Sequence, residues 1–469
     1  MNKKFHQPFW FRDALSFTND KICPPLNGGH NTDICIVGGG YTGLWTAIKI
    51  KQRQPNCQVT ILEKGRCGQG ASGRNGGCML TFATKFPTLL RLFGVEEAIR
   101  LVTASEQAVF DIDNFCKRHN IDAEIRTDGA LYTATNNVQN QQLHQPVELL
   151  SKHNINRWHT LSNNDAIRLS GTSKTLAAIN TDAAGSLNPG KLVLGLKDIA
   201  LSLGINIFEQ TSMQSYQADN ICTIQSSHGQ VTSRKLIFAI NAWTGKYLPW
   251  FKRHYALVSS DMLITRPIPE QLSQIGLKHG KAIADSRIFV HYYRTTLDGR
   301  LMFGKGGNLF AFANKVLAEF DQASSVEDKL KASFFDFFPT LSEQGNLFEP
   351  SWTGPSDRSV TGLPFFGTIP NQPNVSYGLG YSGNGVVQSF LGGEILASLA
   401  LNIDNAWTRS FMAKGPLGKF PPEPIRYLGA NIVKCAVNRK ESAEDNNRSP
   451  WWFDNQLAKF AAAAGKSDK

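Results

Sequence analysis

The chain has 469 residues, of which 41% are hydrophobic and 19% are charged, and its formal net charge is +11. A length of this size predicts two domains within one chain. The most apolar stretch, Gly385 to Leu401, is interrupted by Gln388 and Glu394. We therefore expect no membrane span and no membrane partner. The sequence has no run of five basic residues, so nucleic acid is not an expected partner either.

Cysteine usage and the first 30 residues bear on the compartment. The eight cysteines form no CxxC motif and no Cys/His cluster with zinc spacing, which predicts reduced thiols and no metal site. The start of the chain shows no apolar segment followed by a small-residue cleavage site. We therefore expect a cytoplasmic protein, with residues 1–30 forming an N-terminal arm anchored by aromatic side chains.

A βαβ unit begins at Asp33. The strand DICIV leads into a glycine turn and a helix, and the next strand, QVTILE, ends in an acid. The glycines have G-x-G-x-x-G spacing, which allows a tight turn and a close approach of backbone to a pyrophosphate. The helix N-terminus then faces the phosphates. This pattern predicts a dinucleotide site that includes Gly38, Gly40, Tyr41, Thr42, Gly43, Glu63 and Lys64.

The loop GASGRNGG at 70–77 favours FAD over NAD. After the acid, a plain NAD domain continues into ordinary α/β structure, whereas here a small-residue loop with one cation follows. Such a loop can lie against a pyrophosphate and a flavin ring, although a surface loop without a ligand is the alternative. The predicted contacts are Ala71, Ser72, Arg74, Asn75, Gly76 and Gly77.

In the middle of the chain, predicted helices and strands continue to alternate. Helical periodicity covers 86–119, a strand is expected at 128–135, and a short helix at 163–170. A turn and a helix at 185–204 precede a strand at 204–216. The apolar strand within 234–249 ends in residues that let backbone approach the cofactor, namely Asn241, Ala242 and Trp243.

The last third of the chain combines an antiparallel region with a second glycine turn. Residues 250–345 predict successive antiparallel strands that cover the cofactor. Near 376–401 a short strand gives way to glycines and then a helix, whose N-terminus can stabilise negative charge on a reduced flavin. The predicted contacts there are Gly380, Gly383, Asn384, Gly385 and Val386. In the final extension, WWF at 451–453 is interpreted as an anchor to the body.

Three segments together resemble one family: DICIVGGGYTGLWTAIKI, ILEKGRCGQGASGRNGG and GLGYSGNGVVQSFLGGEILA. The chain is similar, over residues 30 to 402, to the glycine oxidase/sarcosine oxidase/D-amino-acid oxidase (DAO) family of FAD-dependent oxidoreductases. Further segments, WTGPSDRSVTGLPFFG, YYRTTLDGRLMFGKGG and PPEPIRYLGA, look most like its gamma-glutamylputrescine oxidase-like and aminophosphonate oxidoreductase-like branches.

The resemblance implies an α/β fold, α+β overall, in which a Rossmann-like FAD-binding domain carries an inserted antiparallel-sheet substrate domain. We expect an N-terminal arm at 1–30 and a C-terminal extension at 403–469. The FAD-binding domain is expected to be discontinuous, at 31–105, 165–245 and 345–402. The substrate, or cap, domain is expected at 106–164 and 246–344.

The resemblance also implies an activity. The chain is expected to oxidise the C–N bond of a small primary or secondary amine to an imine, by hydride transfer to flavin N5. An amino acid, a polyamine derivative or an aminophosphonate would be the substrate, and O2 would be the acceptor, giving hydrogen peroxide. An amine dehydrogenase with another acceptor, and a flavoprotein that modifies protein or tRNA, are the alternatives. FAD is expected to be non-covalent, and the protein a monomer or homodimer.

Several side chains are candidates for catalysis. An anionic substrate group requires a cation, for which Arg358 is the first choice and Arg294 and Arg287 are further ones. Along the strand at 291–294, His291 and Tyr293 share one face while Tyr292 and Arg294 share the other, and one face should meet the cofactor. Lys305 lies near the position of the family lysine that assists O2 reduction, but is shifted from it along the strand.

Overall fold

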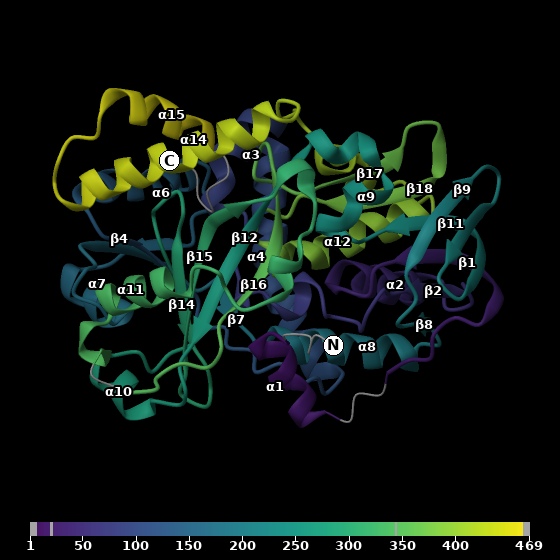
Figure 1. The fold of residues 1–469 in the computed structure, drawn as a ribbon, viewed down its shortest axis with the longest axis horizontal. Helices are drawn as coiled ribbons and strands as arrows, with labels where there is room; N and C mark the ends of the chain where they lie inside the picture. Colours follow the sequence, from purple (N-terminus) through teal and green to yellow (C-terminus); the bar gives the residue numbers. More distant parts are fainter. Residues whose placement is uncertain (1–6, 19–21, 343–344, 463–469) are drawn as a thin grey trace.

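Two eight-stranded sheets lie side by side in the computed structural model, which describes residues 7–18, 22–342 and 345–462 (Figure 1). The first sheet, on the right in Figure 1, contains the dinucleotide motif, and the second, on the left, contains the predicted antiparallel region. A two-stranded ladder, β3 (Cys78–Met79) with β7 (Gly185–Ser186), completes the strand pairing of the described residues. The mixed α/β fold predicted from the sequence is confirmed.

The first sheet has a parallel centre with antiparallel strands at its margin. Its order is β17-β18-β11-β1-β2-β8, with β10 and β9 attached beside β11. Residues Ile34 to Val37 are all buried, as expected for a central parallel strand covered on both faces. The strands are β1 (Gly28–Val37), β2 (Val59–Leu62), β8 (Asn206–Phe208), β9 (Met213–Ala218), β10 (Cys222–Ser226), β11 (Gly229–Phe238), β17 (Phe365–Ile369) and β18 (Gln372–Leu379).

Helices pack around this sheet and form most of the core. The Trp45 ring makes edge contacts with Phe115 and Phe390, at centroid distances of 4.8 and 4.9 Å. The helix predicted over 86–119 is two helices, because Gly94 between them has φ +79°. The helices are α1 (Phe9–Phe17), α2 (Tyr41–Arg53), α3 (Phe86–Phe93), α4 (Val95–Arg118), α8 (Pro189–Ser202), α9 (Thr244–Tyr247), α12 (Gly385–Ala400) and α13 (Ala406–Arg409).

The second sheet has the order β16-β12-β15-β14-β13-β4-β6-β5, and only β13 and β4 pair in parallel. Two of its strands, β6 and β16, fall in ranges that the sequence assigned to the FAD-binding domain, so the chain returns to the first sheet later than predicted at both places. The strands are β4 (Ala130–Ala134), β5 (Trp158–Thr160), β6 (Ala177–Thr181), β12 (Tyr255–Ile264), β13 (Ala282–Asp285), β14 (His291–Thr295), β15 (Leu301–Phe310) and β16 (Trp352–Ser359).

The remaining helices cover the second sheet. Phe334 and Phe337 of α11 pack against Phe303 of β15, which closes the sheet face remote from the first sheet. Among the described residues, no helix is long and apolar enough to cross a membrane. The helices are α5 (Asn137–Leu143), α6 (Gln145–Lys152), α7 (Asn163–Ser170), α10 (Pro269–Gln274), α11 (Glu327–Phe337), α14 (Ile425–Asp445) and α15 (Trp452–Ala462).

Candidate cofactor and active site

A cavity of about 550 Å³ lies between the two sheets. Its wall combines the β1–α2 turn, the end of β2 and the loop at 70–76 with strands β12, β14, β15 and β16. Most of the predicted cofactor residues lie on this wall, and Gly43, Gly77, Ala242, Gly380 and Asn384 lie behind it. Those on the wall are Gly38, Gly40, Tyr41, Thr42, Glu63, Lys64, Ala71, Ser72, Arg74, Asn75, Gly76, Asn241, Trp243, Gly383, Gly385 and Val386.

The β1–α2 turn requires glycine at two positions. Gly38 has φ +113°, a conformation that side chains rarely adopt. A Cβ on Gly43 would lie 2.0 Å from the carbonyl oxygen of Gly38, so the helix could not pack on the strand end. The first helical N–H, that of Tyr41, donates to Ser72 Oγ at 2.9 Å and joins the turn to the loop at 70–77. Backbone and helix N-terminus therefore face the cavity together.

Glu63 is fixed at the end of β2 by backbone donors. Its carboxylate accepts from the N–H of Gly39 and of Gly65, both at 2.8 Å. Burial raises the pKa of this carboxyl, while the two backbone bonds act against that shift. The carboxylate lines the cavity one strand away from the glycine turn, which is the position from which an acid binds ribose hydroxyls.

Arg74 has a different local role from the one its loop suggested. Its guanidinium donates to the Gln69 carbonyl at 3.0 Å and to the Phe320 carbonyl at 2.8 Å, and it pairs with Asp321 at 2.7 Å. Phe320 and Asp321 lie in a segment far away in the sequence. Arg74 thus fixes the loop at 70–77 against the segment beside β16, and its cation is held by protein groups at the edge of the cavity.

Asp357 is a buried acid on the cavity wall that was not among the predicted site residues. Its carboxylate accepts from the N–H of Gly380 in the turn before α12. With its amide nitrogen facing the carboxylate, Asn241 donates to Asp357 Oδ1 at 2.8 Å. Burial raises the pKa of Asp357 to about 7, although the Gly380 bond opposes the shift. Asp357 therefore joins β16, the end of β11 and the turn before α12 at one wall of the cavity.

The chemistry of this wall fits a dinucleotide with an aromatic ring system. Ser356 Oγ is buried on the wall and has no hydrogen-bond partner among the described residues. The turn before α12 presents backbone at Gly383 and Gly385, and the Tyr381 hydroxyl lies 2.7 Å from Thr42 Oγ1 of α2. The N-termini of α2 and α12 therefore meet at the same cavity, where both helix dipoles favour negative charge.

Strand β14 turns its Tyr292 and Arg294 face toward the cavity side. The Tyr292 hydroxyl lies 3.1 Å from Ser260 Oγ, and both residues line the wall. Arg294 does not line the wall. It donates to the carbonyls of Gly76 and Leu187, both at 2.6 Å, and its guanidinium lies 4.5 Å from the Trp10 ring centroid. Arg294 therefore holds the loop at 70–77 in place.

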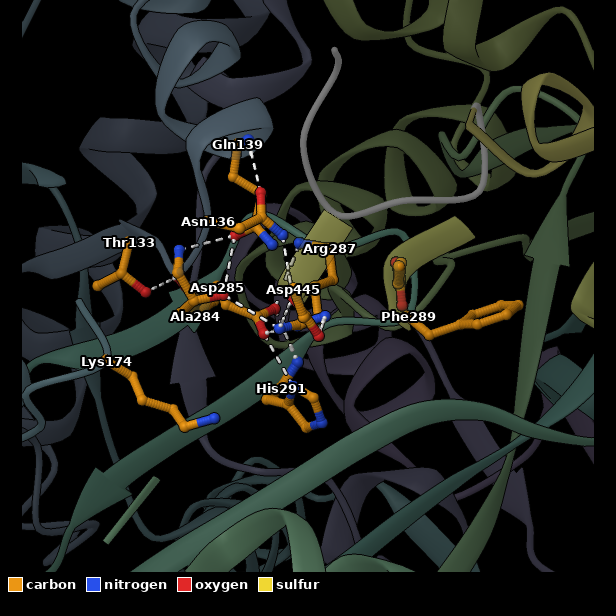
Figure 2. A network of polar contacts seen from close by, with 12 residues as sticks. Thr133, Asn136, Gln139, Lys174, Ala284, Asp285, Arg287, Phe289, His291 and Asp445 are labelled. Carbon is orange, nitrogen blue, oxygen red and sulfur yellow. Dashed lines mark hydrogen bonds and ion pairs between the residues drawn. The ribbon is translucent and has the colours of Figure 1, made fainter. Parts of the chain in front are cut away.

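The other face of β14 does not line the cavity, and three residues predicted for catalysis lie outside it. Figure 2 shows one of them, His291, beside Asp285. His291 Nδ1 lies 2.8 Å from Asp285 Oδ2, and Lys305 Nζ lies 2.8 Å from His291 Nε2. Tyr293 donates to the carbonyl of Ser170 at 2.8 Å within the core under α11. None of His291, Tyr293 and Lys305 lines the cavity. The alternation of a strand defines two faces, but it does not say which face meets a ligand.

The buried group of His291, Asp285 and Lys305 predicts that the stability of the protein depends on pH. Burial and the charge of Lys305 lower the pKa of His291 to about 4. Burial would raise the pKa of Asp285, but His291 and Arg287 outweigh it and hold that pKa at about 2. At His291 the unfolded chain therefore binds more protons than the folded one as the pH falls from about 6.5 toward 4. Asp357, whose pKa burial raises to about 7, acts in the opposite direction, so the contribution of His291 must be measured as a difference. Across this window we expect the unfolding free energy of the wild type, measured by urea unfolding, to fall by at least about 1 kcal/mol relative to that of a variant without His291.

A His291→Gln variant should lose this contribution to the pH dependence of stability, because the residue that gains the proton is gone. The matched control is His159→Gln, since His159 is exposed, and this variant should keep the wild-type slope. The same dependence of unfolding free energy on pH in the wild type and in His291→Gln between pH 6.5 and 4 would contradict the assignment.

Arg358 is the predicted cation that does line the cavity. Its Nη1 donates to the Ser382 carbonyl at 2.6 Å, which places the guanidinium beside the turn before α12. A Cβ on Gly306 or on Gly383 would lie 3.3 or 3.4 Å from its Nη2, so Arg358 occupies the space between β15 and that turn. Burial lowers the pKa of Arg358, yet arginine remains a cation in proteins. The cavity thus holds a positive group next to apolar Met262 and Val290.

Comparison with known proteins supports one family. The model of the family described as "FAD dependent oxidoreductase" (DAO) matches residues 33–399. Gamma-glutamylputrescine oxidoreductase of Escherichia coli is 27% identical over 376 residues, 80% of this chain and 84% of that protein. Glycine oxidase of Geobacillus kaustophilus is 23% identical over 403 residues, 81% of this chain and 95% of that protein.

Solved structures agree on the fold. The crystal structure of glycine oxidase from Geobacillus kaustophilus superimposes with a TM-score of 0.68 at 18% identity, covering 83% of this chain and all of that one. L-proline dehydrogenase from P. horikoshii gives a TM-score of 0.67 at 17% identity, covering 82% of this chain and 97% of that one.

Proposed function

Because this chain belongs to the DAO family of FAD-dependent oxidoreductases, we propose that it oxidises the C–N bond of a small amine that carries an anionic group. It is an FAD enzyme of the amine-oxidising type, as its relatives are. The size and lining of the cavity support a small molecule: aromatic Tyr292 and Tyr381 and the cation of Arg358 surround it. The alternative of a macromolecular target has no comparable support.

The residues on the wall have separate roles in this proposal. The β1–α2 turn would hold the pyrophosphate, Glu63 the ribose, and the turn before α12 the flavin ring. When bound, FAD supplies a two-electron acceptor for a hydride from the carbon next to the amine nitrogen. The protein orients the amine and excludes water, because Met262 and Val290 line the substrate side.

Arg358 is the observation that carries the anionic part of the substrate. A guanidinium binds a carboxylate or a phosphonate through two parallel hydrogen bonds, which fixes the remainder of the molecule relative to the ring. The name of the Escherichia coli relative specifies a gamma-glutamyl amine, a compound with a carboxylate far from the reacting nitrogen. A gamma-glutamyl amine or an amino acid would satisfy both the cation and the apolar wall.

An anaerobic screen tests this proposal. The purified holoenzyme is mixed without oxygen with gamma-glutamyl amines, aminophosphonates, N-methyl amino acids, D-amino acids and the matching neutral amines. We expect an anionic amine to bleach the flavin absorbance and its neutral counterpart to do so much more slowly. Equal bleaching by neutral amines would contradict the role of Arg358, and bleaching by none of them would contradict amine oxidation.

The position of Lys305 bears on which electron acceptor reoxidises the flavin. Lys305, which is shifted along the strand from the position of the family lysine that assists O2 reduction, bonds to His291 and does not line the cavity. This favours a dehydrogenase that passes electrons to another acceptor over the O2-dependent oxidase expected from the sequence. After anaerobic reduction, we expect an artificial quinone to restore the flavin absorbance faster than air does. Faster recovery in air, with one hydrogen peroxide formed per flavin, would support the oxidase.

A further inference from the structure

The C-terminal extension lies outside the part of the chain that matches the family, which ends at residue 399. Its two longest described helices, α14 and α15, pack against each other and lie along the top of the second sheet in Figure 1. Val437 of α14 and Ala458 of α15 share an apolar cluster with Ile288. The extension is therefore an addition to the catalytic fold, and its surface requires an explanation of its own.

Polar and charged bonds attach the inner side of α14 to the body. Asp445 accepts two hydrogen bonds from Arg287, each at 2.8 Å (Figure 2). The Glu441 carboxylate accepts from the N–H of Ile288 at 2.9 Å. An ordinary surface helix packs its apolar stripe inward and keeps its charges outside. Much of the contact of α14 with the body is instead made by its acids.

The extension exposes several large apolar side chains. Three aliphatic side chains with helical spacing are more than half exposed on α14, and aromatic side chains are exposed around α15. The prediction that WWF at 451–453 anchors the extension is wrong, because Trp451 and Trp452 are 68% and 69% exposed. Exposed apolar residues gathered on one element mark an interaction surface. We define the outer surface as Ile425, Leu428, Ile432, Trp451, Trp452 and Phe460.

The charges beside the outer surface are positive. Of the four acids on the two helices, Glu441, Glu444 and Asp454 are buried, and Asp445 is bound to Arg287. Exposed cations are Arg448, Lys459 and Arg439, the last of which forms an ion pair with Asp454 at 2.6 Å. A second copy of the chain would bring these cations against their own counterparts, and the net charge of +11 opposes that contact further. An anionic partner surface is favoured instead.

We propose that the outer surface docks on a membrane surface rich in anionic phospholipid. Tryptophan prefers the boundary between headgroups and acyl chains, aliphatic residues enter that boundary, and lysine and arginine bind anionic headgroups. Such peripheral binding needs no spanning helix, so the expectation of no membrane partner, which rested on span length, does not address it. The proposal does not depend on which amine the enzyme oxidises.

Vesicle flotation of the FAD-loaded protein tests the proposal. Vesicles contain phosphatidylcholine alone or phosphatidylcholine mixed with phosphatidylglycerol. We expect the protein to float with the phosphatidylglycerol vesicles, to bind them less at high salt, and to stay behind with phosphatidylcholine. The affinity of the triple variant I425S/L428S/I432S for phosphatidylglycerol vesicles should fall by at least about tenfold, because the variant loses the inserting side chains.

A second variant and a control keep the test independent of folding. W451S/W452S should weaken binding in the same direction, and both variants should keep the FAD absorbance of the wild type. The control Leu297→Ser changes a side chain that is 64% exposed elsewhere, and it should bind as the wild type does. No binding to either vesicle would overturn the proposal. So would a dimer, seen by analytical ultracentrifugation, that I425S/L428S/I432S dissociates, because the outer surface would then join two copies.

Discussion

The Gly43→Ala variant is expected to purify without FAD, whereas Gly29→Ala keeps the cofactor. A Cβ at position 43 would lie 2.0 Å from the Gly38 carbonyl oxygen, so α2 must move away from the end of β1. The backbone that faces the pyrophosphate moves with it. Overpacking of this kind costs about 1–3 kcal/mol or more in stability, and the loss of backbone contacts adds to the loss of cofactor. The ratio of flavin to protein absorbance measures occupancy.

Gly29 provides the matched control for that experiment. It lies near the start of β1, the strand whose far end leads into the turn before Gly43, and a Cβ there would have no neighbour within 4 Å. The two variants thus make the same chemical change near the start of β1 and beyond its far end. Full FAD occupancy in a folded Gly43→Ala protein would show that the turn does not carry the cofactor, whichever substrate is used.

Replacing Arg358 by methionine is expected to lower kcat/KM for the anionic amine by about 10²–10³-fold, corresponding to about 3–4 kcal/mol. The variant removes the cation from the cavity wall but keeps an unbranched side chain of similar length. A neutral amine should lose little, because it makes no ion pair. Arg358→Lys should lie between the two, since an ammonium keeps the charge but loses the bidentate geometry. Steady-state kinetics with paired anionic and neutral amines measure the difference.

Two controls are needed to assign this loss to substrate binding. The Arg358→Met protein must keep its flavin spectrum, because the guanidinium also bonds to Ser382 in the turn before α12. Arg234→Met removes one positive charge from an exposed ion pair with Asp33 and should leave both substrates unaffected. An equal loss for the anionic and the neutral amine would assign Arg358 to the fold of the turn and not to substrate binding.

The dinucleotide motif could be predicted because its information is local. Gly38, Gly43 and Glu63 belong to one βαβ unit, and the spacing of such a unit fixes which backbone and which acid reach the same edge. The turn before α12 could be predicted for the same reason, since a strand, its glycines and a helix follow one another directly.

The rest of the site depends on distant partners, which the sequence does not state. Arg74 was predicted as a cation for the cofactor, but Phe320 and Asp321 bind it from another segment. Strand β14 has two faces, and the position of α11 decides that His291 belongs to the covered one. Asp357 could not be predicted as a site residue, because a lone acid in a strand acquires its role only through its contacts with Asn241 and Gly380.

The most direct test of amine oxidation is an anaerobic titration with identification of the product. The FAD-loaded enzyme is titrated with the best anionic amine from the screen, and the carbonyl compound formed by imine hydrolysis is quantified by mass spectrometry. We predict one carbonyl product for each FAD reduced, with cleavage of the C–N bond in every turnover. A reduced flavin accompanied by an oxidised substrate whose C–N bond is intact would contradict the account.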